Sequence, residues 1–181
     1  LSRGMEPFRF MLAGGHPNSL GRTEEVVAMV LDDPARMDEL YNCYFSDDEV
    51  VRLRTSSACK RVFRARPDWF DAYADRLLDE ISRIDQPSAK WTLAQLFLEH
   101  QDRLTPDQRG SATNLLVRNL HQEDDWIALN MTMKTLQHWT KQDPALVPRI
   151  EVRVRALADD RRKSVANGAR KLLNAMDVSP L

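Results

Sequence analysis

The sequence predicts an all-α chain that is built from about four repeats of a helix–turn–helix unit. Glycine is scarce, with 6 in 181 residues, and long runs of β-branched residues are absent, a composition that favours helices over strands. Prolines, which suit the first position of a helix, recur at similar intervals, at Pro34, Pro67, Pro106 and Pro144. The apolar share of 43% is large enough to build a core.

Each of these prolines predicts the start of the first helix of a unit. Residues that make good or fair N-caps precede three of them: Asp33, Thr105 and Asp143. The pairs Thr105 with Gln108 and Ser46 with Glu49 match capping boxes. In the last unit a second proline, Pro148, predicts that the helix begins near that residue, after a short turn from Pro144.

A second helix is predicted after an acidic turn in every unit. Apolar or small residues then fall in matching columns, and the second, third and fourth columns lie 4, 7 and 8 residues after the first, which is the spacing of one helix face. The first column holds Val51, Ala89, Ala128 and Val165, and the second holds Thr55, Leu93, Thr132 and Ala169. The third holds Ala58, Leu96, Thr135 and Leu172, and the fourth holds Cys59, Phe97, Leu136 and Leu173.

These patterns predict an organisation in which neighbouring units stack, because one helix pair cannot bury both of its faces. The predicted units are 34–66, 67–105, 106–143 and 144–176, followed by a tail at 177–181. Residues 1–33 are predicted to form an N-terminal loop and a capping helix that begins with Thr23 as its N-cap. The loop Gly14–Arg22 is interpreted as a cap over the first unit, with an anion or peptide contact as the alternative.

The period of about 38 residues, and the basic residue after the first column in Val51-Arg52 and Ala89-Lys90, resemble HEAT repeats of the armadillo-like group. The third and fourth units depart from that pattern, with Leu129 and Ala166 at this place. The resemblance covers about four fifths of the chain. It implies a right-handed α-α superhelix whose second helices line a concave face.

On that face we predict a polar stripe that binds a partner. In the first unit the stripe is basic and carries Arg54, Arg61 and Arg64, at helical spacing with Ser57. Over the later units it continues with mixed charge through Gln95, Glu99, Met131, Lys134, His138 and Lys171. A face of mixed sign favours a protein or peptide with an acidic segment over nucleic acid, because Glu99 and Asp102 interrupt a phosphate-binding track.

Other functions stay open as alternatives. The architecture is also similar to that of HEAT-like DNA glycosylases for alkylated bases, and Trp126 beside Asp124 and Asp125 is the nearest match to the residues which that similarity implies. A hydrolase or transferase would need Glu99 and Asp102 near His138 for acid–base chemistry. A Cys–His nucleophile lacks a motif, and Cys59 is predicted to be a buried thiol in a core column.

Composition and residue spacing also predict which cofactors, sites and targeting segments are absent. No cofactor, metal site, signal peptide or membrane span is expected, because the histidines lack ligand spacing and no apolar run is long enough. Two cysteines make no disulfide framework, so a cytoplasmic setting is expected. The last helix, with Leu172, Leu173 and Met176, is a candidate surface for self-association.

Overall fold

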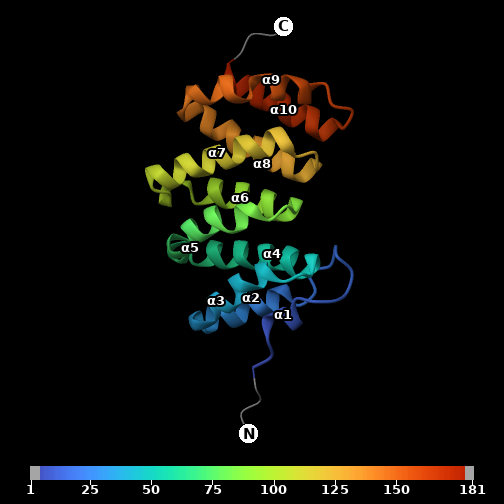
Figure 1. Ribbon diagram of the computed structural model, residues 1–181, viewed down its shortest axis with the longest axis vertical. Helices are drawn as coiled ribbons and strands as arrows, with labels where there is room; N and C mark the ends of the chain where they lie inside the picture. The colour runs from blue at the N-terminus through green and yellow to red at the C-terminus, as the bar shows by residue number, and fades with distance from the viewer. Residues whose placement is uncertain (1–4, 178–181) are drawn as a thin grey trace. The chain divides into compact units, whose positions relative to one another are not determined.

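The computed structural model describes residues 5–177, and the regular structure of these residues is helical, with no strand among them (Figure 1). The predictions for residues 1–4, and for all of the tail beyond Asp177, lie outside the described residues. The α-helices are α1 (Phe8–Met11), α2 (Thr23–Asp32), α3 (Met37–Asn42), α4 (Glu49–Ala65), α5 (Pro67–Asp79), α6 (Pro87–Glu99), α7 (Pro106–Gln122), α8 (Trp126–Gln142), α9 (Val147–Ala158) and α10 (Lys163–Met176). Short 3₁₀ helices are η1 (Pro34–Arg36), η2 (Cys43–Phe45), η3 (Ile81–Arg83), η4 (Gln101–Arg103) and η5 (Pro144–Leu146).

The chain divides into two compact units, Leu1–Tyr73 and Ala74–Leu181, and the division falls within α5. In the first unit α2 and α3 pack against α4, and α1 packs against α2 and α3. Aromatic rings fill much of this core: Tyr41 meets Tyr44 edge to face at 5.8 Å between ring centroids, and Phe63 meets Phe70 at 5.7 Å. Such pairs bury large apolar areas in favourable geometry.

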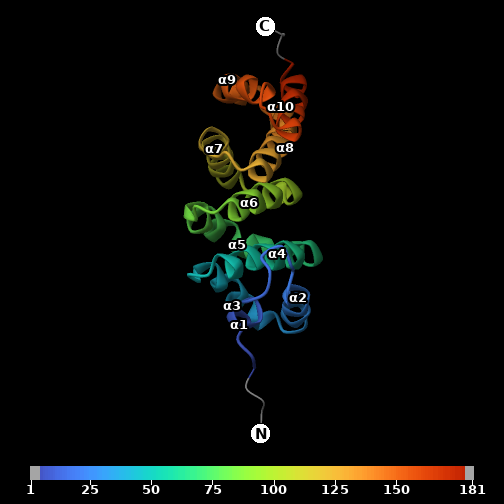
Figure 2. The same ribbon diagram turned by 90° about the vertical axis from the view of Figure 1, so that its right-hand side faces the viewer.

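In the second unit the second helix of each pair packs against the second helix of the next, α6 on α8 and α8 on α10. Figure 2 shows α8 and α10 on one side of this unit, with α7 and α9 on the other. The predicted columns explain the packing, because every column residue except Leu173 is buried, from Val51 and Ala89 to Ala169 and Leu172. The predicted core faces of the second helices are therefore confirmed.

The acidic turn after α7 is held by basic side chains from three places in the second unit. Lys90 of α6 contacts Glu123 at 2.8 Å and also Asp85 at 2.9 Å. Arg162 contacts Asp124 at 3.0 Å, and Arg153 of α9 donates to the carbonyl oxygens of Leu120 and Glu123. Burial opposes the charge on Lys90, but the two carboxylates outweigh it and raise the pKa of this amine.

Several predicted helix ends are confirmed. α5 and α7 begin at Pro67 and Pro106, and the capping box of Thr105 and Gln108 forms in both directions. The first helix of the last predicted unit is α9. It begins at Val147, next to Pro148, and follows the 3₁₀ turn η5 that starts at Pro144.

Other predicted ends are wrong in detail. Asp48, not Ser46, caps α4, and it accepts from the backbone N–H of Val50 at 2.8 Å. Thr23 is the first residue of α2 rather than its N-cap, because its hydroxyl donates back to the carbonyl of Leu20. Pro34 opens a 3₁₀ turn, and the short helix α3 follows it.

Candidate functional site

The candidate functional site is a groove of about 550 Å³ between α8 and α10, which we call the α8–α10 groove. Three residues of the predicted stripe line it together: Lys134 and His138 from α8 and Lys171 from α10. The remaining lining residues are polar or small: Asn130, Gln137, Ser164, Asn167 and Gly168. The groove therefore offers amide, hydroxyl and ammonium groups.

Helical spacing places these side chains on one surface. Lys134 and His138 are four residues apart, so they follow each other along one face of α8. The opposite face of α8 carries the buried column residues Ala128, Thr132 and Leu136. At Gly168 the two helices approach closely, since a Cβ there would lie 2.8 Å from the Asn130 Oδ1 atom.

The groove carries uncompensated positive charge. Lys134, His138 and Lys171 are exposed, and no acidic residue is among those that line the groove. Within residues 5–177, neither lysine has an ion-pair partner. Ammonium groups in this state are available to an anionic ligand.

The other stripe residues of the second unit lie outside the groove. Gln95 is half-buried on α6 and donates to Glu99, whose side chain is exposed, at 3.3 Å. Met131 is half-buried on α8. The structure thus brings Lys134, His138 and Lys171 together, and it leaves the α6 residues and Met131 outside the walls of the groove.

Arg54 is a correction to the predicted stripe, because it is buried, with 2% of its surface exposed. Its guanidinium donates to the carbonyl oxygens of Leu12 (2.9 Å), Gly14, His16 (3.1 Å) and Ser19 (3.2 Å). We call this arrangement the Arg54 clamp. The helical periodicity of α4 places Arg54 on the same face as Arg61, but the loop between α1 and α2 covers that end of the face.

Glycine makes the close approach of this loop possible. Gly21 has a φ of +53°, in the left-handed region, and a Cβ there would lie 3.1 Å from the Arg54 Cζ atom. The Gly14–Arg22 loop is therefore held on the first unit, and its carbonyl oxygens, not its amides, face the buried charge.

Arg61 and Arg64 stay on the surface of α4 in the first unit. Arg61 is half-buried, 3.6 Å from Glu24 and 3.4 Å from the Ser57 hydroxyl. Arg64 is exposed and also interacts with other described residues. Because Arg54 is buried and Arg61 is paired with an acid, the basic stripe in this unit is weaker than the sequence predicts.

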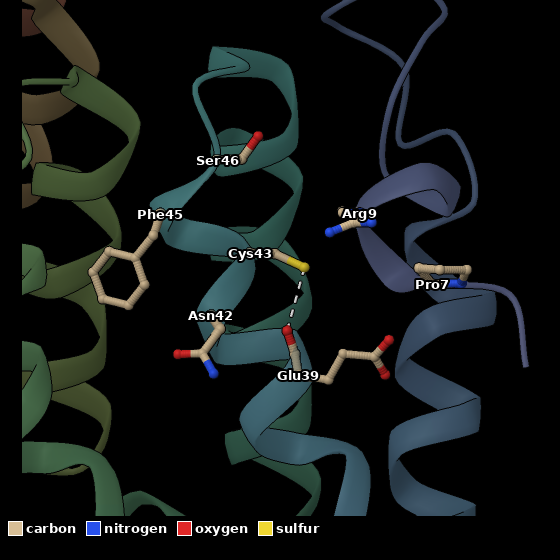
Figure 3. A pocket seen from close by; sticks show the side chains of 7 residues that line it. All are labelled: Pro7, Arg9, Glu39, Asn42, Cys43, Phe45 and Ser46. Atoms are coloured by element: carbon tan, nitrogen blue, oxygen red, sulfur yellow. Dashed lines mark hydrogen bonds between the residues drawn. The ribbon is translucent and has the colours of Figure 1, made fainter.

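A second pocket, of about 490 Å³, lies in the first unit and includes Cys43, Arg9 and Glu39 (Figure 3). The Cys43 thiol donates to the Glu39 carbonyl at 3.3 Å. Burial raises the pKa of Cys43 to about 11, with a further contribution from Glu39, so the nucleophilic thiolate is scarce near neutral pH. Cys59 is fully buried, as predicted, and burial raises its pKa as well.

Two of the three residues that the glycosylase alternative would use, Asp124 and Asp125, have structural contacts. Trp126 is 52% exposed at the start of α8. Asp125 caps this helix by accepting from Ala128 at 2.9 Å, and Asp124 pairs with Arg162. Both carboxylates are therefore already engaged at the turn.

Two further predictions concern the histidines and the last helix. His100, expected to be half-buried, is buried, with 6% of its surface exposed. Within residues 5–177, no group of three or more His, Cys, Asp or Glu side chains is placed to hold a metal ion.

Leu172 and Met176 are buried and Leu173 is half-buried, so α10 lacks the apolar surface that self-association was expected to use.

Sequence reasoning missed the uncharged wall of the groove. The signal was present in the helical spacing around the predicted residues. Asn130 and Gln137 lie four residues before and three after Lys134, and Ser164, Asn167 and Lys171 lie at i, i+3 and i+7. From the sequence alone, neutral polar residues at these positions cannot be distinguished from those of an ordinary solvent-exposed helix face. The distinction requires knowing which helix packs beside them.

In comparisons with known proteins, no protein-family model, curated protein or solved structure matches the chain. Among the described residues, no helix is both long and apolar enough to cross a bilayer. The case for a function therefore depends on the site itself.

Proposed function

We propose that this chain is a non-enzymatic interaction module that binds an acidic segment of a partner protein, with the α8–α10 groove as the centre of the contact. The observation that carries the proposal is the pair of lysines in this groove, which are exposed and unpaired within residues 5–177. A glutamate- or aspartate-rich segment would supply the missing negative charge. We also propose a cytoplasmic setting, and two free cysteines support it.

The fold assignment behind this function is also a proposal: a right-handed superhelix of HEAT-like repeats. Two features support it. Buried columns recur in each helix pair, and the second helices α6, α8 and α10 pack in succession. Repeats of this kind present extended surfaces rather than enclosed pockets, which suits the binding of a segment.

Besides its charged groups, the groove carries neutral polar groups that can fix the position of a bound segment along the helices. The side chains of Gln137 and Asn167 carry amides that can pair with the backbone of a bound segment. On the neighbouring helix α6, Glu99 is exposed and would repel an acidic residue. The partner is therefore expected to carry its acids opposite α8 and α10 and a neutral or basic residue opposite α6.

Fluorescence anisotropy with a labelled oligoglutamate peptide tests the proposal. The double variant Lys134→Gln/Lys171→Gln removes both unpaired charges and keeps the side chains polar. We expect it to weaken binding by about tenfold or more, since charge-assisted contacts contribute about 1.5–3 kcal/mol each.

Lys163→Gln is the matched control, because Lys163 is an exposed lysine of α10 outside the groove. It should leave the affinity close to that of the parent chain. The control removes one charge and the double variant removes two, so a loss in the control of half that of the double variant in free energy would mean that net charge alone drives binding, and the groove would then not be the site.

A further inference from the structure

A different pocket, of about 480 Å³, lies among α7, α8 and α9 in the second unit and carries two guanidinium groups. Arg109 comes from α7 and Arg149 from α9, and Trp139, Asn114 and Gln142 are also in its walls. We call it the arginine pocket. It shares no residue with the α8–α10 groove.

Arg109 is held in a defined orientation. Its Cζ atom lies 3.7 Å from the centroid of the Trp139 ring, and Trp139 is completely buried. Its Nη2 donates to the Gln142 Oε1 at 2.8 Å. A guanidinium stacked on an indole keeps its plane fixed, so its remaining N–H groups point in set directions and can bind an oxyanion with two parallel hydrogen bonds.

Both arginines contact neutral groups. Arg149 donates to the Asn114 Oδ1 at 2.8 Å, and within residues 5–177 neither arginine forms an ion pair. Asp143 is the acidic residue among those lining the pocket, and its Oδ1 accepts from the Ala145 N–H as a cap. The two guanidinium groups therefore lie near carboxylates that do not pair with them directly.

Two further observations concern the burial of polar groups in this pocket. Burial lowers the pKa of Arg109 even though Asp143 and Asp102 act to raise it, so this charge is partly removed from water. The Trp139 Nε1 is a buried donor with no hydrogen-bond partner among the described residues. Buried donors in this state are uncommon in native proteins.

From this geometry we propose that the arginine pocket binds a phosphate group, with Arg109 and Arg149 as its charge-assisted donors. A phosphate dianion matches two guanidinium groups better than a carboxylate does, because it accepts from both at once. The Asn114 Oδ1 is directed to Arg149, which leaves the Nδ2 amide of Asn114 as a further donor. The phosphate is carried either by a small molecule or by a phosphorylated side chain.

The test is an NMR titration of the full chain that follows the indole Nε1–H resonance of Trp139. The probes are inorganic phosphate, a phosphoserine peptide with glycine and alanine neighbours, and acetate, each at constant ionic strength with chloride as the balancing anion. We expect a saturable shift with phosphate, with a Kd on the order of 1 mM. If the natural ligand is a phosphorylated side chain, the phosphoserine peptide should bind more tightly than inorganic phosphate. If the natural ligand is a small phosphate compound, the peptide should bind no more tightly than inorganic phosphate.

Arg149→Gln is the decisive variant, since Arg149 is exposed and its loss leaves the core intact. It should weaken phosphate binding by about tenfold. Arg109→Lys keeps the charge but loses the planar donors, and it should weaken binding by a similar factor. Lys134→Gln/Lys171→Gln, in the separate groove, should leave phosphate binding unchanged.

Three results would overturn the proposal. They are the absence of saturation with phosphate, unchanged affinity in Arg149→Gln with a well-dispersed spectrum, and acetate binding as tight as that of phosphate. None of them bears on the α8–α10 groove, because the acidic-peptide experiment uses other residues.

Discussion

At the scale of single residues, Arg54 has the largest expected effect on stability. Replacing it with methionine keeps an unbranched apolar stem but removes the guanidinium donors to the four carbonyls, of which His16 also accepts from the Ser19 N–H. We expect the free energy of unfolding to fall by about 3 kcal/mol, because hydrogen bonds from a buried charge contribute strongly and each carbonyl loses its charged donor. Urea denaturation followed by circular dichroism measures this loss.

Arg61→Met on the same helix is the control for Arg54. Arg61 is partly exposed and pairs with Glu24 at 3.6 Å, so its loss should cost about 0–1 kcal/mol. If the two variants unfold at the same urea concentration, the Arg54 clamp does not stabilise the first unit and our account of the loop is wrong.

Asp160 provides a prediction about pH at the same scale. The side chain of Arg162 donates to this carboxylate, the Arg162 backbone N–H adds a second hydrogen bond, and together they lower the pKa of Asp160 to about 2. A carboxylate whose pKa is lower in the folded chain stabilises the fold above its unfolded value of about 4. That stabilisation is lost as the pH falls from about 4 to about 2.

Carbon-detected NMR of the Asp160 carboxyl group tests this directly. Arg162→Gln should move the pKa of Asp160 up towards its ordinary value, since it removes the strongest donor. A pKa that stays near 2 in this variant would contradict the assigned cause. In thermal unfolding, the parent chain and Asp160→Asn should differ at neutral pH and converge in acid.

At the scale of helices, two glycines provide a matched comparison. Gly110 in α7 has open space where an alanine Cβ would lie, so Gly110→Ala should stabilise the chain by about 0.5–1 kcal/mol through helix propensity. Gly168→Ala has the same gain but places its Cβ 2.8 Å from the Asn130 Oδ1 and 3.2 Å from the Met133 Cε. We expect it to be less stable than Gly110→Ala by about 1 kcal/mol or more.

Thermal unfolding of the two alanine variants measures the difference between them. Equal gains would mean that Asn130 and Met133 move aside at no cost and that α8 and α10 do not need the glycine. The result also bears on the groove, because Asn130 and Gly168 both line it.

Most of the helices were predictable from the sequence because their signals are local. Column residues such as Ala128 and Val165 recur at helical spacing, and proline with a cap residue fixes a helix start, as at Thr105 and Pro106. The Arg54 clamp was not predictable in this way. Its hydrogen bonds join residues about 40 positions apart, and the spacing of α4 alone shows a face but not what covers it.

The candidate site was predictable in part for the same reason. Lys134 and His138 share a helix, so their common face follows from spacing. Their proximity to Lys171 depends on how α8 packs against α10, which the repeat pattern indicated. The arginine pocket lay beyond sequence reasoning, because the stack of Arg109 on Trp139 joins side chains of different helices.

At the scale of the whole molecule, charge balance limits what the chain can bind. It holds 26 Lys and Arg against 27 Asp and Glu, for a net charge of −1. The chain as a whole therefore attracts nucleic acid only weakly over long distances. Only a few phosphates of a bound duplex would find a basic side chain to contact. We expect binding of labelled duplex DNA to be weak at low salt and absent at about 0.15 M salt.

Anisotropy titrations of single- and double-stranded DNA over a range of salt concentrations measure this. The two lysines of the α8–α10 groove would support a slope of log K against log salt of at most about −2. A much steeper slope, or submicromolar binding at physiological salt, would favour the nucleic-acid alternative over the acidic peptide. An assay for release of alkylated bases would follow in that case.

The Arg54 clamp also has a consequence for how the loop between α1 and α2 opens. One guanidinium donates to four carbonyl oxygens, so its withdrawal breaks these four contacts between α4 and the loop in the same event, while the Ser19 N–H bond to His16 stays within the loop. The loop is then expected to be either closed or fully open, without a graded series of intermediates. A protease that cuts near Gly14 and one that cuts near Ser19 should therefore cleave the folded chain with the same opening equilibrium.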